Sequence, residues 1–200
     1  MKKKLSGNIL IFCGCLCILA GAGIYANNQK IDKEGEKHCS TITSEFQTLV
    51  ESSPSEQSPE DSILTSLRSE VILINGDLYI GLLEIPSLDI TLPIYMDMTA
   101  QNLTNAPCVY EGSLSENNLV IAGHNYRSHF WDLRYLEKGA QLSITNPNGR
   151  VYHYVVEEKE LVHERDLSVL EDRGDLMLFT CNYPDNNYRI VLQCEKTMGF

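Results

Sequence analysis

The stretch LMLFTCNYPDNNYRIVLQC, residues 176–194, contains two apolar runs separated by a short polar segment. Both runs are rich in Leu, Ile, Val and aromatic side chains, which is typical of β-strands. Asn, Pro and Asp between them favour a turn, so we expect an antiparallel pair. Cys181 ends the first run and Arg189 opens the second. This pairing would bring a thiol and a guanidinium to the same end of a sheet.

Short runs of the same kind recur from residue 71 onward, separated by turn residues. NPNG at 146–149 is a strong hairpin signal. About eight short strands with few helices predict a mainly β fold, a closed or nearly closed β-barrel. Short helices are expected at 129–139, ending at Gly139, and at 166–172. The predicted strands are 71–75, 78–86, 90–95, 108–112, 118–124, 141–145, 151–161, 176–181 and 188–194.

The N-terminus predicts a membrane anchor. Lys2, Lys3 and Lys4 precede an uncharged apolar stretch at 9–26, close to the ~20 residues that a helix needs to cross a bilayer. The lysines favour a cytoplasmic N-terminus and an extracellular body. A cleaved signal peptide, with Ala20-Gly21-Ala22 as its site, is the alternative, but the apolar stretch continues past that site. Acylation at Cys15 fits less well, because Phe12 and Cys13 depart from the lipoprotein pattern.

The chain therefore divides into three predicted parts: the lysines and anchor at 1–26, a polar stalk at 27–70, and a β-barrel domain at 71–200. The segment 51–62 is rich in Ser, Glu and Pro and cannot form a core. Two short helices are compatible with the stalk. One carries Ile42, Phe46, Leu49 and Val50 at helical spacing, and the other starts at Ser62.

Charge and cysteine content limit the function. The net charge is −11, and residues 31–200 hold 12 basic and 27 acidic groups, a net of −15. Such an acidic body argues against nucleic acid as a partner. Seven cysteines are present, and none is arranged in a pattern that suggests zinc or another cofactor. Export would permit a disulfide between Cys108 and Cys194, and the sequence leaves open whether they pair.

Cys181 is the first candidate for chemistry. A buried structural cysteine is the simpler interpretation, but the residue stands where an apolar strand opens into a polar loop. A nucleophilic thiol needs a base and an oxyanion donor. His124 ends the run NLVIAGH in the same context, and Arg189 can hydrogen-bond a developing oxyanion. The competing interpretations are a structural histidine and a surface arginine paired with Asp185 or Glu195.

EIPSL (84–88), NLVIAGHN (118–125), LMLFTC (176–181) and YRIVLQC (188–194) together resemble the sortases. These are membrane-anchored cysteine transpeptidases built on an eight-stranded β-barrel. The resemblance covers about residues 76–196 and implies that Cys181 is the nucleophile, with His124 and Arg189 as its catalytic partners. Met177 departs from the family pattern, which has a threonine there, and this concerns substrate detail rather than chemistry.

The resemblance also implies a reaction and partners. The Cys181 thiolate attacks the carbonyl after Thr in a sorting signal similar to Leu-Pro-x-Thr-Gly, carried by a surface protein. An amine of a peptidoglycan precursor or a pilin lysine then takes the acyl group. The subclass stays open: class A- or D-like, or an unusual class B relative. Some members of the family bind calcium near the active-site face, but we interpret Glu111 and Glu116 as solvated surface acids. No cofactor is predicted.

Residues 99–118 and 157–175 are expected to border the substrate groove. Three other functions remain compatible with the sequence. A membrane-tethered cysteine peptidase would use the same residues and transfer the acyl group to water. An inert barrel would bind a surface peptide without reacting, which intact Cys181, His124 and Arg189 argue against. In a stalked interaction module the three residues would be a coincidence.

Overall fold

The computed structural model describes residues 2–52, 70–166, 168–171 and 174–199. The chain forms two compact units, Met1–Glu34 and Gly35–Phe200. The second helix predicted in the stalk, from Ser62, lies almost entirely outside the described residues. The elements are α1 (Lys2–Ser52), β1 (Ile72–Ile74), β2 (Asp77–Ile85), η1 (Pro86–Leu88), β3 (Ile90–Tyr95), α3 (Ala100–Asn105), β4 (Cys108–Glu111), β5 (Leu119–Ala122), η2 (Trp131–Tyr135), β6 (Gln141–Thr145), β7 (Val151–His163), η3 (Ser168–Leu170), β8 (Leu176–Cys181) and β9 (Tyr188–Thr197).

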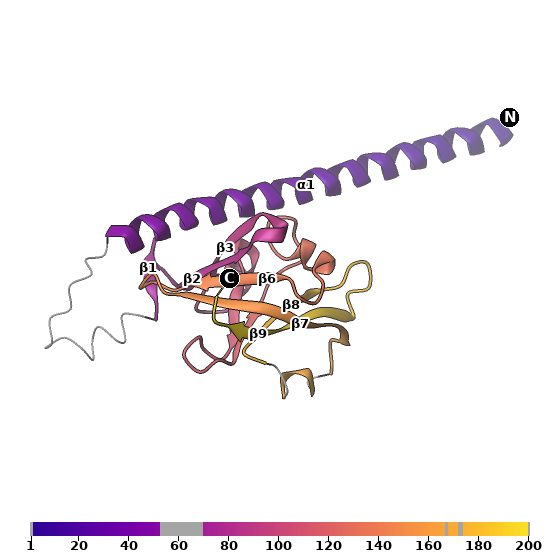
Figure 1. Ribbon diagram of the computed structural model, residues 1–200. Coiled ribbons are helices and arrows are strands. Elements are labelled where there is room, and N and C mark those ends of the chain that lie inside the picture. Colours follow the sequence, from indigo (N-terminus) through magenta and orange to yellow (C-terminus); the bar gives the residue numbers. More distant parts are fainter. Residues whose placement is uncertain (1, 53–69, 167, 172–173, 200) are drawn as a thin grey trace, which may run out of the picture. The chain divides into compact units, whose positions relative to one another are not determined.

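The strands close into a barrel, as predicted. The sheet runs β1-β2-β3-β4-β5-β8-β9-β7-β6, and β6 pairs back onto β2. Eight strands therefore form the closed barrel, and β1 is an additional short strand hairpinned onto β2. Most neighbours are antiparallel, but β3–β4 and β5–β8 are parallel. In Figure 1, β7, β8 and β9 lie side by side, in agreement with their pairing.

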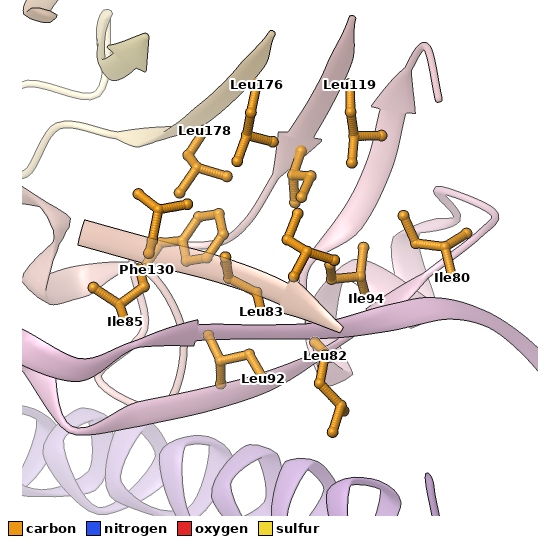
Figure 2. Close-up of a cluster of buried hydrophobic side chains, with 14 of the residues drawn as sticks. Ile80, Leu82, Leu83, Ile85, Leu92, Ile94, Leu119, Phe130, Leu176 and Leu178 are labelled. Atoms are coloured by element: carbon orange, nitrogen blue, oxygen red, sulfur yellow. The ribbon is translucent and has the colours of Figure 1, made fainter. Parts of the chain in front are cut away.

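Apolar side chains at alternate positions along the strands fill the barrel interior. Leu83 and Ile85 of β2 point toward Leu119 of β5 and toward Leu176 and Leu178 of β8 (Figure 2). All five side chains are essentially inaccessible to water. Because successive side chains of a strand face opposite ways, the residues between them, such as Met177 and Phe179, face outward. The outward face of β8 is the one that carries Cys181.

The C-terminal part of α1 packs on the barrel. Cys39, Ile42 and Phe46 are buried and belong to the same apolar cluster as the barrel interior. The His38 ring accepts or donates a 2.8 Å hydrogen bond with the Tyr95 hydroxyl and stacks on that ring. The helical spacing of Ile42 and Phe46 was therefore correctly identified, but the helix is one continuous element from Lys2 to Ser52 rather than a short one. The boundaries of the stalk at 27–70 stay a prediction.

A short helix is present within the predicted segment 129–139, but it is shorter than predicted. The structure has a 3₁₀ helix, η2, over Trp131–Tyr135. The Leu136 N–H bonds to Leu133 O, and the Gly139 N–H donates to Val156 O of β7. Helical bonding ends early because the strand β7 supplies the next backbone acceptor. The helix predicted at 166–172 is likewise a single 3₁₀ turn, η3.

The disulfide between Cys108 and Cys194 does not form. Both cysteines are buried and carry free thiols. Cys108 lies on β4 and Cys194 on β9, and these strands are not neighbours in the sheet. Two thiols on non-adjacent strands fill core space as small apolar groups.

We expect Phe46→Ala to lower the free energy of unfolding by about 3–5 kcal/mol, because it leaves a cavity between α1 and the barrel. Phe46 is 1% exposed, whereas Leu49 on the same helix is 41% exposed. Urea unfolding of the full chain in mild detergent, followed by the fluorescence of the single tryptophan, measures the change. Leu49→Ala is the matched control and should cost under about 1 kcal/mol. Equal losses in both variants would contradict the observed packing.

Within the described residues, α1 is the one helix that is long and apolar enough to cross a membrane. Its large apolar side chains between Ile9 and Tyr25 are exposed. By length and composition this part of the helix fits the predicted single-pass anchor at 9–26.

Candidate active site

Cys181 and Arg189 face each other across the β8–β9 pair. They are Cα partners in the antiparallel register. The Asn182 N–H donates to Tyr188 O at 2.9 Å, which makes the next pair along, Cys181 and Arg189, a non-hydrogen-bonded one. In such pairs both side chains lie on one face, with Cβ atoms typically ~4.5–5.5 Å apart. The pairing predicted from residues 176–194 is therefore confirmed.

His124 lies two residues beyond the end of β5, which is the neighbour of β8 on the side opposite β9. β5 and β8 run parallel, with Ala122 opposite Phe179, and the Gly123 N–H continues the ladder to Phe179 O at 3.1 Å. His124 and Cys181 are each two residues beyond the Ala122–Phe179 pair. Because parallel strands end at the same edge of a sheet, the imidazole and the thiol are carried at one edge, with Cys181 on the central strand.

Glycine at position 123, directly after β5, permits the close approach of the Phe130 ring. A Cβ atom there would lie 2.5 Å from the Phe130 ring, closer than any real contact. Phe130 is fully buried, and its N–H donates to His124 O at 3.1 Å. The loop 124–130 therefore folds back tightly on the residue that precedes His124.

Burial sets the protonation of His124. The ring is partly shielded and lies against the Tyr126 ring in a tilted arrangement, with ring centroids 4.7 Å apart. Desolvation lowers the pKa of His124 below its ordinary value. The imidazole is therefore mostly neutral at pH 7, and its protonated share rises as the pH falls.

Arg189 is held by three acceptors. Its Nη1 donates to Asn186 O at 2.7 Å and to Tyr188 O at 3.2 Å, and its Nη2 pairs with Glu164 Oε2 at 3.2 Å. The ion partner is Glu164, not Asp185 or Glu195. Sequence reasoning missed Glu164, although it directly follows β7. These contacts leave further N–H groups of the guanidinium available to a ligand, since arginine has five.

An apolar hollow of about 110 Å³ lies beside Arg189 on the outer face of β8 and β9. Its lining draws on both predicted groove borders, with Tyr110 from the first and six residues between Val162 and Leu170 from the second. Met177 is fully buried and forms part of its floor. The lining comprises Tyr110, Val162, His163, Glu164, Asp166, Val169, Leu170, Met177, Phe179, Arg189 and Val191.

Cys181 differs from the other cysteines of its unit. Among those that the structure describes in Gly35–Phe200, Cys39, Cys108 and Cys194 are buried and Cys181 alone is partly exposed. Burial raises the pKa of Cys108 and of Cys194 to about 12, which keeps both thiols protonated at neutral pH. A reagent from solvent therefore meets one accessible thiol in this unit, and it stands beside a guanidinium.

The surface acids near this face do not converge. Glu111 and Glu116 are both exposed, and the Glu116 carboxylate accepts a 3.2 Å hydrogen bond from the Asn118 side chain. Across residues 2–52, 70–166, 168–171 and 174–199, no group of three or more His, Cys, Asp or Glu side chains could hold a metal ion.

Comparison with known proteins gives a consistent result. A family model for the sortase domain matches residues 83–197. A sortase A of Listeria monocytogenes is 24% identical over 144 residues, which cover 67% of this chain and 64% of the relative. A sortase A of Bacillus anthracis is 32% identical over 121 residues, which cover 56% of this chain and 57% of the relative. The matches thus span less than two thirds of either relative.

Solved structures share the fold. A sortase C of Streptococcus pneumoniae has a TM-score of 0.62 at 18% identity, covering 78% of this chain and 96% of that one. A sortase D5 of Clostridium perfringens has a TM-score of 0.59 at 21% identity, covering 84% and 99%. At these identities the likeness establishes the barrel and leaves the subclass open.

Proposed function

Because the chain belongs to the sortase family of cysteine transpeptidases, we propose that it is itself a transpeptidase. It would cleave a sorting signal of the Leu-Pro-x-Thr-Gly kind and join the new carboxyl end to an amine. The observation that carries the proposal is the position of Cys181. This accessible thiol lies directly opposite Arg189 on β9, and β5, the strand on its other side, leads into His124.

In the first half of the proposed reaction, the Cys181 thiolate attacks the carbonyl carbon of the scissile amide and a sulfur–carbon bond forms. Negative charge moves to the carbonyl oxygen, where an N–H group of Arg189 can donate to it. The carbon–nitrogen bond then breaks. In the share of molecules in which His124 is protonated, its proton passes to the departing amine nitrogen, so the amine leaves neutral and a thioester remains on Cys181.

In the second half, an acceptor amine attacks the thioester carbonyl. The same oxyanion forms and is stabilised by the same guanidinium. The incoming nitrogen loses a proton to His124, the sulfur–carbon bond breaks, and Cys181 returns as a thiolate. Water would complete the same sequence and give hydrolysis, so the choice between transferase and peptidase depends on the acceptor.

The apolar hollow supports the proposal that the substrate is a peptide. Its walls are mostly Val, Leu, Met and aromatic side chains, and Arg189 stands at its border. A hollow of about 110 Å³ suits one aliphatic side chain. A bound peptide that places such a side chain there would pass Arg189 on its way to Cys181. We propose this as the site for the apolar residue of the sorting signal.

The proposed partners follow from the same assignment. Residues 9–26 would hold the enzyme in a bilayer, with the N-terminal lysines in the cytoplasm and the barrel outside. Substrates would be surface proteins with a C-terminal sorting signal. The acceptor would be an amine of a peptidoglycan precursor or a pilin lysine, and the two remain alternatives.

Intact-mass spectrometry tests the function. The full chain, in mild detergent, is incubated with a library of sorting-signal peptides, with and without triglycine or hydroxylamine as acceptor. We expect an acyl adduct on Cys181 and, with acceptor present, a product in which the peptide is joined to the amine. The sequences of the peptides that react would also identify the sorting motif.

Two other outcomes would change the assignment. An adduct that only hydrolyses, whatever amine is added, favours a peptidase. No adduct with any peptide, while iodoacetamide still alkylates Cys181, would contradict the proposed acyl transfer and favour a peptide-binding barrel.

A further inference from the structure

The helix α1 touches the loop that follows His124. Gly35 is buried, and a Cβ atom at this position would lie 2.8 Å from Ser128 Oγ and 3.4 Å from His129 Nε2. Glycine inside a helix costs up to about 1 kcal/mol relative to alanine. Its presence here lets the helix backbone approach the loop more closely than any side chain would allow.

A shared acceptor joins helix and loop. The carbonyl oxygen of Asn105, the last residue of α3, has no partner within its own helix. It accepts from Cys39 Sγ of α1 at 3.4 Å and from His129 Nε2 at 2.9 Å. Burial lowers the pKa of His129 to about 4, so the ring is neutral and Nε2 carries the proton. Within the part of the chain that the structure describes, His129 Nδ1 has no hydrogen-bond partner. The Asn105 bond is thus the hydrogen bond that holds the ring.

The loop transmits this contact to His124. The His129 N–H donates to Tyr126 O at 3.0 Å, and the two rings lie 5.6 Å apart between centroids. Tyr126 in turn contacts the His124 ring in a tilted arrangement, with centroids 4.7 Å apart. The Phe130 N–H donates to His124 O. His124 and His129 are therefore the two ends of one turn held by hydrogen bonds and ring contacts, so we expect displacement of one end to move the other.

We propose that the segment Gly35–Phe46 of α1 is a positioning element for His124, acting through Cys39, Asn105 and His129. Gly35, Cys39 and His129 are then positioning residues, not catalytic ones. The inference rests on the proposed function only in assigning His124 a catalytic role. The contact itself is defined without any substrate.

The effect should appear in turnover and not in substrate binding. The apolar hollow is lined by residues of β4, β7, β8 and β9 and by Glu164, Asp166, Val169 and Leu170. None of its lining residues belongs to α1, α3 or the loop 124–130. A shift of His124 by about 1 Å costs up to 10²-fold in rate when proton transfer needs a fixed geometry. KM should change little.

The test compares two valine substitutions on one helix in the full chain. Gly35→Val pushes α1 away from Ser128 and His129, whereas Ser40→Val places the same side chain at an exposed position. We expect kcat to fall about 10–100-fold in Gly35→Val with KM unchanged, and both constants to stay normal in Ser40→Val. NMR titration of ¹³C-labelled histidines in detergent, with His124 assigned through His124→Gln, reads the same displacement without substrate. The pKa of His124 should rise toward its ordinary value in Gly35→Val.

Each result decides the inference. A His124 titration that is unchanged in folded Gly35→Val overturns it. If Gly35→Val does not fold, Cys39→Ala removes only the sulfur that contacts Asn105, and it must still move the titration or the proposal fails. A shifted His124 titration in a chain that shows no acyl transfer even as wild type supports the positioning element and rejects the proposed function. The two can therefore fail separately.

Discussion

Cys181→Ala is expected to abolish acyl transfer, with a loss of at least about 10³-fold. The reaction needs a sulfur–carbon bond, and the remaining thiols of Gly35–Phe200 that the structure describes are buried. No acyl adduct should appear on the protein in mass spectra with any peptide that acylates the wild type.

Cys108→Ala is the matched control. It removes a thiol that burial keeps protonated, since the pKa of Cys108 is about 12. This variant should keep the adduct and the product, with only a modest loss of stability from the smaller side chain. Product formation by Cys181→Ala at more than a thousandth of the wild-type rate would rule out the thioester mechanism.

Arg189→Lys is expected to reduce kcat by about 10²–10³-fold, the usual effect of losing one oxyanion donor. Arg189 already donates from Nη1 to two backbone carbonyls and from Nη2 to Glu164. It can reach a substrate oxygen as well only because the guanidinium has further N–H groups in a planar fork. An ammonium has three donors without that geometry. The change conserves charge, so the loss would report geometry and not simple electrostatics.

Steady-state transfer of a fluorescent peptide to triglycine measures the effect of Arg189→Lys. Arg165→Lys makes the same change at an exposed position close to Glu164, and its rates should match the wild type. If Arg189→Lys also keeps near-normal kcat, the guanidinium serves only to hold the end of β9 to Glu164.

The pairing of β8 with β9 could be predicted because it is local. A short polar turn joins two apolar runs, so the antiparallel register follows from the turn and puts Cys181 opposite Arg189. The strand positions followed for the same reason, since alternation and turn residues are properties of neighbouring residues. His124 could be singled out because it follows an apolar run, as Cys181 does, and the resemblance to a known family then implied its catalytic role.

The tertiary structure decided what distant residues do together. β5 and β8 are parallel neighbours although more than fifty residues separate them, and no local signal specifies that pairing. Glu164 reaches Arg189 because β7 and β9 pair up to His163 and Tyr188. These contacts depend on closure of the barrel.

The roles of polar residues in the core were also set by packing. His38 and Cys39 stand in a sequence segment that reads as stalk, yet they contact Tyr95 and Asn105. The spacing of Ile42 and Phe46 predicted an apolar helix face but did not indicate which part of the protein packs against it. A buried polar group must find its partner within the fold. The sequence by itself therefore determined the strands and the Cys181–Arg189 pair, while folding alone decided which distant groups surround them.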